Sequence, residues 1–349
     1  MTVPERREPL APLHPLAPIE RYGGPGRGRP PALSEILASP DMDPELLFSD
    51  PSPDPPAAPR PYTGGPPTVA GDLDPAMAGR PLKELCAKVT GLGEAEAAEL
   101  VRFGAAWVGS RQKTDPEMPL PESGDFRVNL PAYGLLRFYE ADPERIVYED
   151  DHVLVYDKES GRPSQGVPHD AHNNALSALE RLTGCSLRLP HRLDAGTSGL
   201  LMTAKTREAA GELGKSFQKG RVAKRYVALS AGEGPEWDET EADASIAKNA
   251  GKLVARANGP GLAARTTLRV LARRGPKTLF LAVPHTGRTH QIRLHLSFLG
   301  CPVAGDRFYG GVPARRLMLR ATGLAFPHPA TGQVVVLGEP WRGEDGGRM

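Results

Sequence analysis

The chain has 349 residues, enough for two modest domains, and its 43 basic side chains against 42 acidic ones give a formal net charge of +1. No run approaches the roughly 18 consecutive apolar residues that a membrane span needs, and the N-terminus lacks the apolar core of a secretory signal; the sequence therefore predicts a cytoplasmic protein and excludes a membrane one. The three cysteines, Cys86, Cys185 and Cys301, lie far apart in no paired spacing, which argues against a disulfide framework and a cysteine-based zinc site.

The first 79 residues are a proline-rich segment. Proline recurs every few residues, as in HPLAPIE, GPGRGRPPAL and DPSPDPPAAPRP. Because proline removes backbone donors and the segment has no periodic apolar positions, residues 1–79 are predicted to be disordered or polyproline-like. No motif in the segment assigns it a role.

A small αβ domain is predicted over residues 80–132. PLKELCAKVTG has apolar residues at helical spacing with Gly91 to end the helix, and GEAEAAELVRFGA predicts a second helix that ends at Gly104. AAWVGSRQ and PESGDFRVNLP follow as strands with turns. This order resembles the small ribosomal-protein-type RNA-binding domain attached to many RNA-modifying enzymes, but the helical half is acidic and a generic αβ unit would have the same pattern.

The main domain is predicted over residues 141–340. RIVYEDDHVLVYDKESG predicts two strands around an acidic turn, and DAHNNALSALERLTG predicts a helix that ends at Gly184. A helix over residues 207–217 behind a Thr206 cap and the strand KRYVALSAG follow. RTTLRVLARR and KTLFLAVP predict a hairpin, TGRTHQIRLHLSFLG a helix closed by Gly300, and GLAFPHPATGQVVVL a final hairpin.

These elements follow no regular βαβ rhythm, so the predicted fold class is α+β with a largely antiparallel mixed sheet. Charge is also unevenly distributed: residues 1–80 carry about −4, residues 81–140 about −2, and the rest of the chain about +7. The C-terminal surplus permits a basic face that binds a polyanion such as RNA.

The stretch PHRLDAGTSGLLMTAKT, residues 190–206, places a single carboxylate, Asp194, between Arg192 and a turn rich in glycine and hydroxyl groups. Glycine permits a close approach of the backbone to a ligand. The spacing does not match a G-x-S-x-G nucleophile elbow or a phosphate-binding P-loop. Because a turn cap or an ion pair with Arg192 would also explain Asp194, this motif alone leaves its role open.

Three histidines, His285, His290 and His295, are spaced by five residues. That spacing spreads them around a helix and does not align them as metal ligands on one face. The sequence therefore predicts no metal site here.

Four motifs occur in a fixed order: HRLDAGTSGLLMTAKT, KRYVALSAG, PHTGRTHQIRLHLSFLGCPVAGDRFYGG and LAFPHPATG. Together they resemble the RluA-type pseudouridine synthases, the ribosomal large-subunit and tRNA uridine isomerases, over roughly residues 145–337. The resemblance implies the pseudouridine synthase catalytic fold, the isomerisation of specific uridines in rRNA or tRNA, RNA as the partner and no cofactor. We further expect a monomer.

The resemblance also assigns roles to residues of this chain. The family's catalytic HRLD aspartate maps onto Asp194, the tyrosine of its K-x-Y-x-A strand onto Tyr226, and the arginine of its H-Q-[IL]-R segment onto Arg293. The HRLD arginine, which enters the RNA stack when the target base leaves it, maps onto Arg192. Further substrate-binding residues are expected at four positions: His191, Thr197, Arg288 and His290.

Pseudouridine formation breaks the glycosidic bond, turns the uracil and rejoins it through carbon five. A carboxylate can attack the anomeric carbon as a nucleophile or act as a base at the neighbouring ribose carbon, and the sequence leaves both routes open. Either route needs Asp194 ionised, which a guanidinium such as Arg293 favours. Tyr226 offers a ring face to the detached uracil and a hydroxyl to help remove the last ring proton. Arg192 suits the gap that the flipped base leaves, because its planar cation stacks on bases.

Two departures from the family pattern lie where the rim of an RNA site is expected. Ala195 and Gly196 follow the aspartate where many relatives carry a charged residue, and Glu159 in DKESGRPSQG stands in place of a proline. Neither change touches Asp194, so the choice of target is what they affect.

Two rival functions belong to other classes. A non-catalytic RNA-binding or RNA-folding protein on the same scaffold would have no use for the set Asp194, Tyr226 and Arg293. A carboxylate hydrolase acting on a sugar or nucleoside would need a second acid within a few ångströms of Asp194, and no adjacent motif supplies one.

Overall fold

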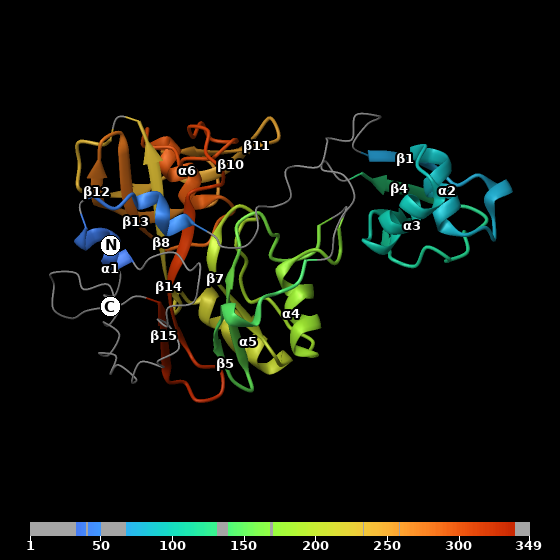
Figure 1. Cartoon of the computed structure of the whole chain (residues 1–349), viewed down its shortest axis with the longest axis horizontal. Helices are drawn as coiled ribbons and strands as arrows, with labels where there is room; N and C mark the ends of the chain where they lie inside the picture. Colours follow the sequence, from blue (N-terminus) through green and yellow to red (C-terminus); the bar gives the residue numbers. More distant parts are fainter. Residues whose placement is uncertain are drawn as a thin grey trace, which may run out of the picture. The chain divides into compact units, whose positions relative to one another are not determined.

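The computed structural model describes residues 33–39, 41–49, 68–130, 139–167, 170–232, 234–257 and 259–338. The chain, drawn in Figure 1, divides into two compact units. The first unit comprises Asp50–Ala210 and Ala314–Leu317, and the second comprises Met1–Ser49, Gly211–Pro313 and Met318–Met349. Within the described ranges, no helix combines the length and the apolar character needed to cross a membrane.

The first unit contains the small αβ domain. Its antiparallel sheet has the order β1-β4-β2-β3, with the bounds β1 Thr68–Asp72, β4 Asp125–Asn129, β2 Ala106–Val108 and β3 Arg111–Lys113. The two predicted helices are present as α2 (Leu82–Thr90) and α3 (Glu94–Arg102). Gly91 ends α2 with a positive φ of 73°, a conformation that glycine adopts without strain.

Strand β1 lies before residue 80, in the segment predicted to be disordered. It is ordered because it pairs with β4 along its whole length, with Val69 opposite Val128, and long-range pairing leaves no local sequence signal. The short 3-10 helix η2 (Pro75–Met77) follows it, with Met77 in the core between the sheet and the two helices. The small domain therefore includes residues before position 80.

The first unit also contains the strands and the helix that carry the HRLD turn. Strands β5 (Ile146–Glu149), β6 (Val153–Lys158) and β7 (Ser198–Ala204) pair antiparallel in that order. The 3-10 helix η3 (Pro143–Arg145) precedes β5, and α4 (Ala175–Thr183) ends at Gly184 with a φ of 68° as predicted. Every residue of β7 is buried, so the turn before it is attached to a fixed core strand.

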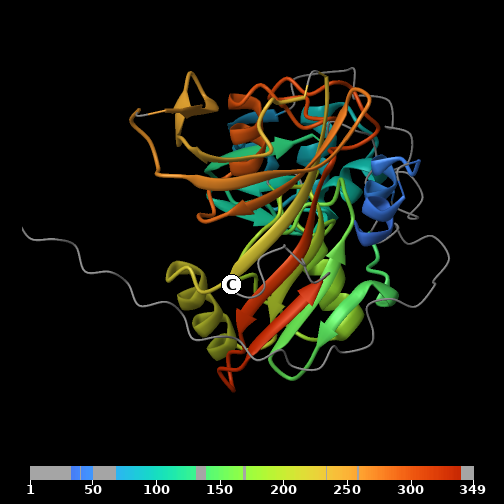
Figure 2. The same cartoon turned by 90° about the vertical axis from the view of Figure 1, so that its left-hand side faces the viewer.

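The second unit is built on an antiparallel sheet with the order β14-β8-β13-β12-β9, and β15 pairs with β14 (Figures 1 and 2). The bounds are β8 Ala223–Ala231, β9 Glu239–Asp243, β12 Arg265–Arg274, β13 Lys277–Pro284, β14 Leu319–Pro327 and β15 Val334–Gly338. Figure 2 shows β14 and β15 side by side in red. The two predicted hairpins, β12–β13 and β14–β15, are thus confirmed.

Two helices and one further hairpin complete these elements. Helix α5 (Arg207–Gln218) connects the units, and the Thr206 hydroxyl accepts the amide of Ala209 at 3.0 Å, which confirms the predicted cap. Helix α6 is Gln291–Phe298. The hairpin of β10 (Ser245–Asn249) and β11 (Lys252–Arg256) forms a separate two-stranded sheet that the sequence does not predict.

Residues 33–49, also predicted to be disordered, contain helix α1 (Leu33–Ala38) and the 3-10 helix η1 (Pro44–Phe48). Pro44 stands at the start of η1, where a missing N–H costs nothing, and the Asp43 carboxylate caps the helix. Four apolar side chains of this segment are buried: Leu33, Ile36, Leu47 and Phe48. Proline content here marks a helix start and not disorder.

Two cations from the β12–β13 hairpin hold this segment. The Arg274 guanidinium donates to the carbonyl oxygens of Ser39, Ile36 and Met42 at 2.6, 2.8 and 2.7 Å. Lys277 lies 2.8 Å from a carboxylate oxygen of Asp43 and 2.8 Å from one of Glu45. The segment is therefore part of the second unit.

Candidate active site

The HRLD turn lies directly before β7. Its backbone closes through the Thr197 amide, which donates to the Asp194 carbonyl oxygen at 3.1 Å. The Asp194 side chain is half-buried, Arg192 is exposed, and Thr197 is 3% exposed. The turn thus presents a carboxylate and a cation next to a rigid strand.

The Lys158 ammonium group is hydrogen-bonded to the backbone of the turn. Lys158 is fully buried at the end of β6, and its Nζ donates to the carbonyl oxygens of Arg162 at 2.7 Å, Glu159 at 2.8 Å and Ala195 at 3.2 Å. Because Ala195 is the residue after Asp194, Lys158 fixes the backbone that carries the carboxylate. Lys158 was not among the predicted site residues, although DKESGRPSQG stands where the family has a lysine-proline-glycine segment.

The electrostatics of Lys158 connect it to Asp194. Burial lowers the pKa of the Lys158 ammonium from its ordinary value to about 7, against the charges of Glu159 and Asp194, which raise it. Burial therefore disfavours the charged form of Lys158, and nearby carboxylates favour it. Removing Asp194's charge would weaken that support.

The Ala195-Gly196 pair is held by further hydrogen bonds. The Gly161 amide donates to the Ala195 carbonyl at 2.8 Å, and the Ser160 hydroxyl donates to the Gly196 carbonyl at 2.7 Å. A Cβ atom at Gly196 would lie 3.1 and 3.2 Å from side-chain atoms of Leu317, tighter than ordinary contact. Glycine at position 196 therefore permits close packing, and Ala195 is the exposed member of the pair.

Glu159, which replaces the family's proline, belongs to a buried polar network. Its carboxylate is 5% exposed and accepts hydrogen bonds from the Tyr139 and Tyr156 hydroxyls, the latter at 2.9 Å. Arg145 Nε lies 3.5 Å from the same carboxylate. Burial and the nearby carboxylate raise the pKa of both tyrosines. This network lies in the core, so the prediction that Glu159 lies at the rim of a binding site is wrong.

His191 occupies a structural position at the turn. Its Nε2 accepts the Met202 amide of β7 at 3.0 Å, which requires the proton on Nδ1 in the neutral ring. The first unit therefore brings together four predicted site residues: His191, Arg192, Asp194 and Thr197.

Tyr226 and Arg293 belong to the second unit. Tyr226 lies on β8 between two neighbours, opposite Ala282 of β13 and Ala321 of β14, and is 9% exposed. The small alanines on either side leave room for the phenol ring. The ring is thus fixed in a central strand.

Arg293 on α6 makes a bidentate ion pair with Asp306. Its Nε donates to Asp306 Oδ2 at 2.7 Å and its Nη2 to Asp306 Oδ1 at 2.9 Å, and the side chains are 6% and 0% exposed. Burial acts to raise the pKa of Asp306, but the Arg293 hydrogen bonds and charge, with the Phe308 and Tyr309 amides, lower it overall. Sequence reasoning missed Asp306, although it lies inside the quoted motif segment VAGDRFYGG.

Aromatic rings surround this ion pair. The Arg293 guanidinium carbon lies 5.0 Å from the ring centre of Tyr309 and 5.6 Å from that of Phe308. His290, whose φ of 57° is unusual for a residue other than glycine, contacts the Tyr309 hydroxyl through Nδ1 at 2.7 Å. The Arg293 guanidinium thus contacts the Asp306 carboxylate and lies beside the rings of Phe308 and Tyr309.

The remaining residues of the THQIRLH segment differ in role. Arg288 is exposed and its Nε donates to the Ala263 carbonyl at 3.0 Å. His295 is fully buried, bonded to the Thr266 hydroxyl at 2.9 Å and the Ala244 carbonyl at 3.0 Å, and burial lowers its pKa. In the described part of the chain, no group of three His, Cys, Asp or Glu residues is placed to hold a metal ion.

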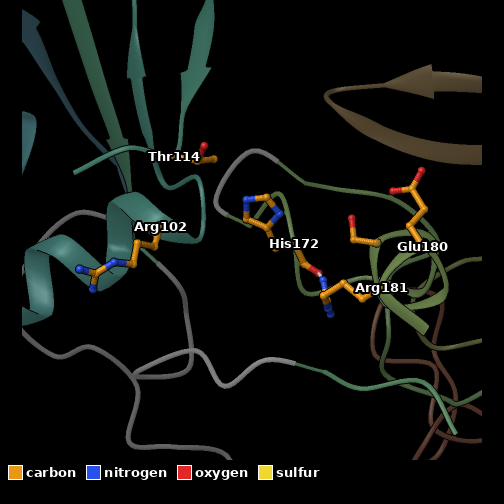
Figure 3. A pocket seen from close by; sticks show the side chains of 6 residues that line it. Arg102, Thr114, His172, Glu180 and Arg181 are labelled. Carbon is orange, nitrogen blue, oxygen red and sulfur yellow. Dashed lines mark hydrogen bonds between the residues drawn. The ribbon is translucent and has the colours of Figure 1, made fainter. Parts of the chain in front are cut away.

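A pocket elsewhere in the first unit is shown in Figure 3. Six side chains line it: Arg102, Thr114, His172, Ser177, Glu180 and Arg181. Arg181 donates to the carbonyls of Tyr139 at 2.6 Å and His172 at 3.4 Å, and Arg102 pairs with Glu99. None of the lining residues is a predicted site residue, and its arginines are engaged in contacts within the protein.

Comparison with known proteins adds independent information. Residues 152–298 match a family model described as RNA pseudouridylate synthase. Ribosomal large subunit pseudouridine synthase C of Salmonella typhi is 32% identical over 283 residues, covering 72% of this chain and 86% of that protein. The same-named protein of Vibrio cholerae is 38% identical over 208 residues, covering 56% of this chain and 65% of its own length.

A solved structure, the human RNA pseudouridylate synthase domain containing 1, is 29% identical with a TM-score of 0.49, covering 56% of this chain and 82% of that one. Among the sequence relatives, the Vibrio cholerae protein is matched over slightly less than two thirds of its length.

Proposed function

The chain belongs to the RNA pseudouridylate synthase family, and from that premise we propose that it is an RNA pseudouridine synthase that isomerises specific uridines. The observation that supports this best is the HRLD turn, where Asp194 is presented beside an exposed Arg192 and fastened by Lys158 through the Ala195 carbonyl at 3.2 Å. Burying the Lys158 ammonium group costs free energy. A protein that only binds RNA would not need to bear that cost to fix the backbone next to one carboxylate.

In the proposed reaction, Asp194 begins the breaking of the glycosidic bond. As a nucleophile it would bond to the anomeric carbon while the uracil departs with the bonding electrons; as a base it would take a proton from the neighbouring ribose carbon. Both routes leave a uracil that turns and bonds to the anomeric carbon through carbon five. In the nucleophile route the bond between Asp194 and the anomeric carbon breaks as this bond forms; in the base route the neighbouring ribose carbon regains its proton. The proton on carbon five is then lost and the ring nitrogen N1 gains one, a transfer that we propose the Tyr226 hydroxyl assists.

Arg293 is proposed to support the charge of the site. Its guanidinium is fixed by Asp306 at 2.7 Å, so it is oriented before any substrate arrives. Arg192, exposed on the turn, is proposed to occupy the gap left by the flipped uridine. His191, Arg288 and His290 are proposed to line the RNA-binding surface. Thr197 was predicted there too, but it is 3% exposed and is proposed instead to hold the turn through its amide.

The RNA class is proposed from the names of relatives. Ribosomal large subunit pseudouridine synthases are among the most similar proteins found, which favours ribosomal RNA over tRNA. The small domain with α2 and α3 is proposed to add RNA contacts, and we propose that the protein acts as a monomer in the cytoplasm.

A comparison of pseudouridine maps tests the proposed function. Total RNA from a strain lacking the gene, its parent, and the deletion strain carrying the wild-type gene is mapped for pseudouridine across the transcriptome. We expect one or a few sites in ribosomal RNA to disappear on deletion and return with the gene. Identical maps in all three strains would contradict the proposal.

Replacing Lys158 tests its positioning role. Lys158→Met removes the hydrogen bond to Ala195 and frees the turn that carries Asp194, and a displacement of about 1 Å costs roughly 100-fold in rate. We expect kcat to fall about 100-fold with KM for RNA nearly unchanged, measured by tritium release from uracil-labelled RNA. Lys215→Met, at a lysine 62% exposed, is the matched control and should leave both constants unchanged.

Lys158→Met should also change how the free energy of unfolding depends on pH. Because the pKa of Lys158 is about 7 in the folded protein and about 10.4 when unfolded, the unfolded chain binds the extra proton between these values. The free energy of unfolding of the wild type should therefore rise with pH across this window relative to Lys158→Met. Urea unfolding at several pH values measures it, and parallel curves would contradict a depressed pKa.

A further inference from the structure

Phe308 stands out among the apolar side chains of the second unit. It is 79% exposed, more than any other large apolar side chain in the described ranges, whereas Phe298 is 48% exposed. A single exposed apolar residue is common and means little alone. Phe308 is distinguished by its contacts with the buried ion pair of Arg293 and Asp306.

Phe308 is fixed to the Arg293–Asp306 ion pair. Its backbone amide donates to Asp306 Oδ1 at 3.0 Å, and its ring centre lies 5.6 Å from the Arg293 guanidinium carbon. The carboxylate that orients Arg293 therefore also fixes the backbone of Phe308, and the ring lies beside the Arg293 guanidinium. A flat apolar surface held in one place loses little conformational entropy on binding.

Phe308 belongs to a cluster of rings. Its centre lies 6.4 Å from that of His290 and 6.4 Å from that of Tyr309. His290 keeps a strained φ of 57°, and a strained backbone at an exposed cluster is typical of functional surfaces. Aromatic rings beside a guanidinium are the side chains on which nucleobases stack.

We propose that Phe308 is a stacking platform for a base of the RNA substrate. A base that loses its stacking neighbour when the uridine is extruded has an uncovered face, and Phe308 offers an exposed ring next to Arg293 to cover it. Stacking tolerates any base, so Phe308 contributes affinity and orientation more than sequence choice. This inference rests on the proposed function, because it takes RNA as the substrate.

Two measurements test the platform. The first is the quenching of 2-aminopurine in a single-stranded RNA oligonucleotide bound to the full-length protein, which reports direct stacking. The second is kcat and KM on ribosomal RNA from the deletion strain. Wild type, Phe308→Ala and Phe308→Trp are compared, with Phe298→Ala as the matched control for losing an exposed ring.

We expect Phe308→Ala to lose the quenching, to bind RNA about tenfold more weakly, and to raise KM while kcat changes little. Phe308→Trp should restore all three, and Phe298→Ala should match the wild type. Quenching and affinity in Phe308→Ala equal to the wild type, or equal losses in both alanine variants, would overturn the inference. A wild type that quenches but forms no pseudouridine would count against the proposed function and not against the platform.

Discussion

Asp194→Asn is expected to reduce pseudouridine formation by at least about 1,000-fold in kcat. The amide can neither attack the anomeric carbon nor accept a proton, and loss of a nucleophile or base costs this much or more. The substitution keeps the size of the side chain and leaves the backbone bond from Thr197 to the Asp194 carbonyl intact. Tritium release from uracil-labelled ribosomal RNA measures the loss.

The same variant separates catalysis from binding. RNA affinity should stay close to that of the wild type, because Arg192 and the turn remain. The melting temperature should fall only slightly, because Asp194 is one of several groups that favour the charged form of Lys158. Asp151→Asn, which alters an exposed carboxylate in the acidic turn before β6, is the matched control and should be fully active. Turnover by Asp194→Asn near the wild-type rate would exclude Asp194 as the catalytic residue, and with it the family assignment of the HRLD aspartate.

Elements with local signals were predictable from the sequence. Helix α4 has an asparagine cap at Asn174 and ends at Gly184 with a φ of 68°, and both signals act within a few residues. The β12–β13 hairpin is similar, since its apolar alternation and short Gly275-containing turn specify its pairing. The order of the motifs, together with the comparisons, fixes the family.

Features that depend on distant partners were not predictable. Helix α1 is held by Arg274, whose bond to the Ile36 carbonyl spans 238 positions, so proline content predicted disorder there. Strand β10 is short, and its two apolar residues, Ile246 and Ala247, are adjacent, so its pairing with β11 is not marked by any alternation. The bond from Lys158 to the Ala195 carbonyl was missed for the same reason, because it joins residues 37 positions apart.

Asp306 is the clearest case of a site residue found by structure. The resemblance predicts Arg293 beside the catalytic carboxylate, and the structure gives this guanidinium a dedicated second carboxylate at 2.7 Å. A rival hydrolase would need a second acid available for chemistry. The Asp306 oxygens accept hydrogen bonds from Arg293 and from the Phe308 amide, which makes Asp306 a positioning residue and not a proton donor.

Asp306→Asn should destabilise the protein by about 3–5 kcal/mol, because it removes the charge of a fully buried carboxylate that accepts two hydrogen bonds from the Arg293 guanidinium. The double variant Asp306→Leu with Arg293→Met should cost less than the sum of the single changes, since it removes both charges together. Glu212→Gln, which breaks a pair whose side chains are 62% and 54% exposed, is the control and should cost less than about 1 kcal/mol. Urea unfolding measures all of them.

The pH dependence provides a second check on the ion pair. The folded-state pKa of Asp306 is lowered, so its contribution to stability is complete above the unfolded value of about 3.9 and is lost as pH falls through the folded value. The wild type should therefore lose stability below about pH 4, where Asp306→Asn shows a smaller loss. Two results would show that Arg293 does not depend on this carboxylate: equal acid sensitivity in the two proteins, or a cost below about 1 kcal/mol for Asp306→Asn at neutral pH. In that case Asp306 would not hold Phe308 in a fixed position next to Arg293.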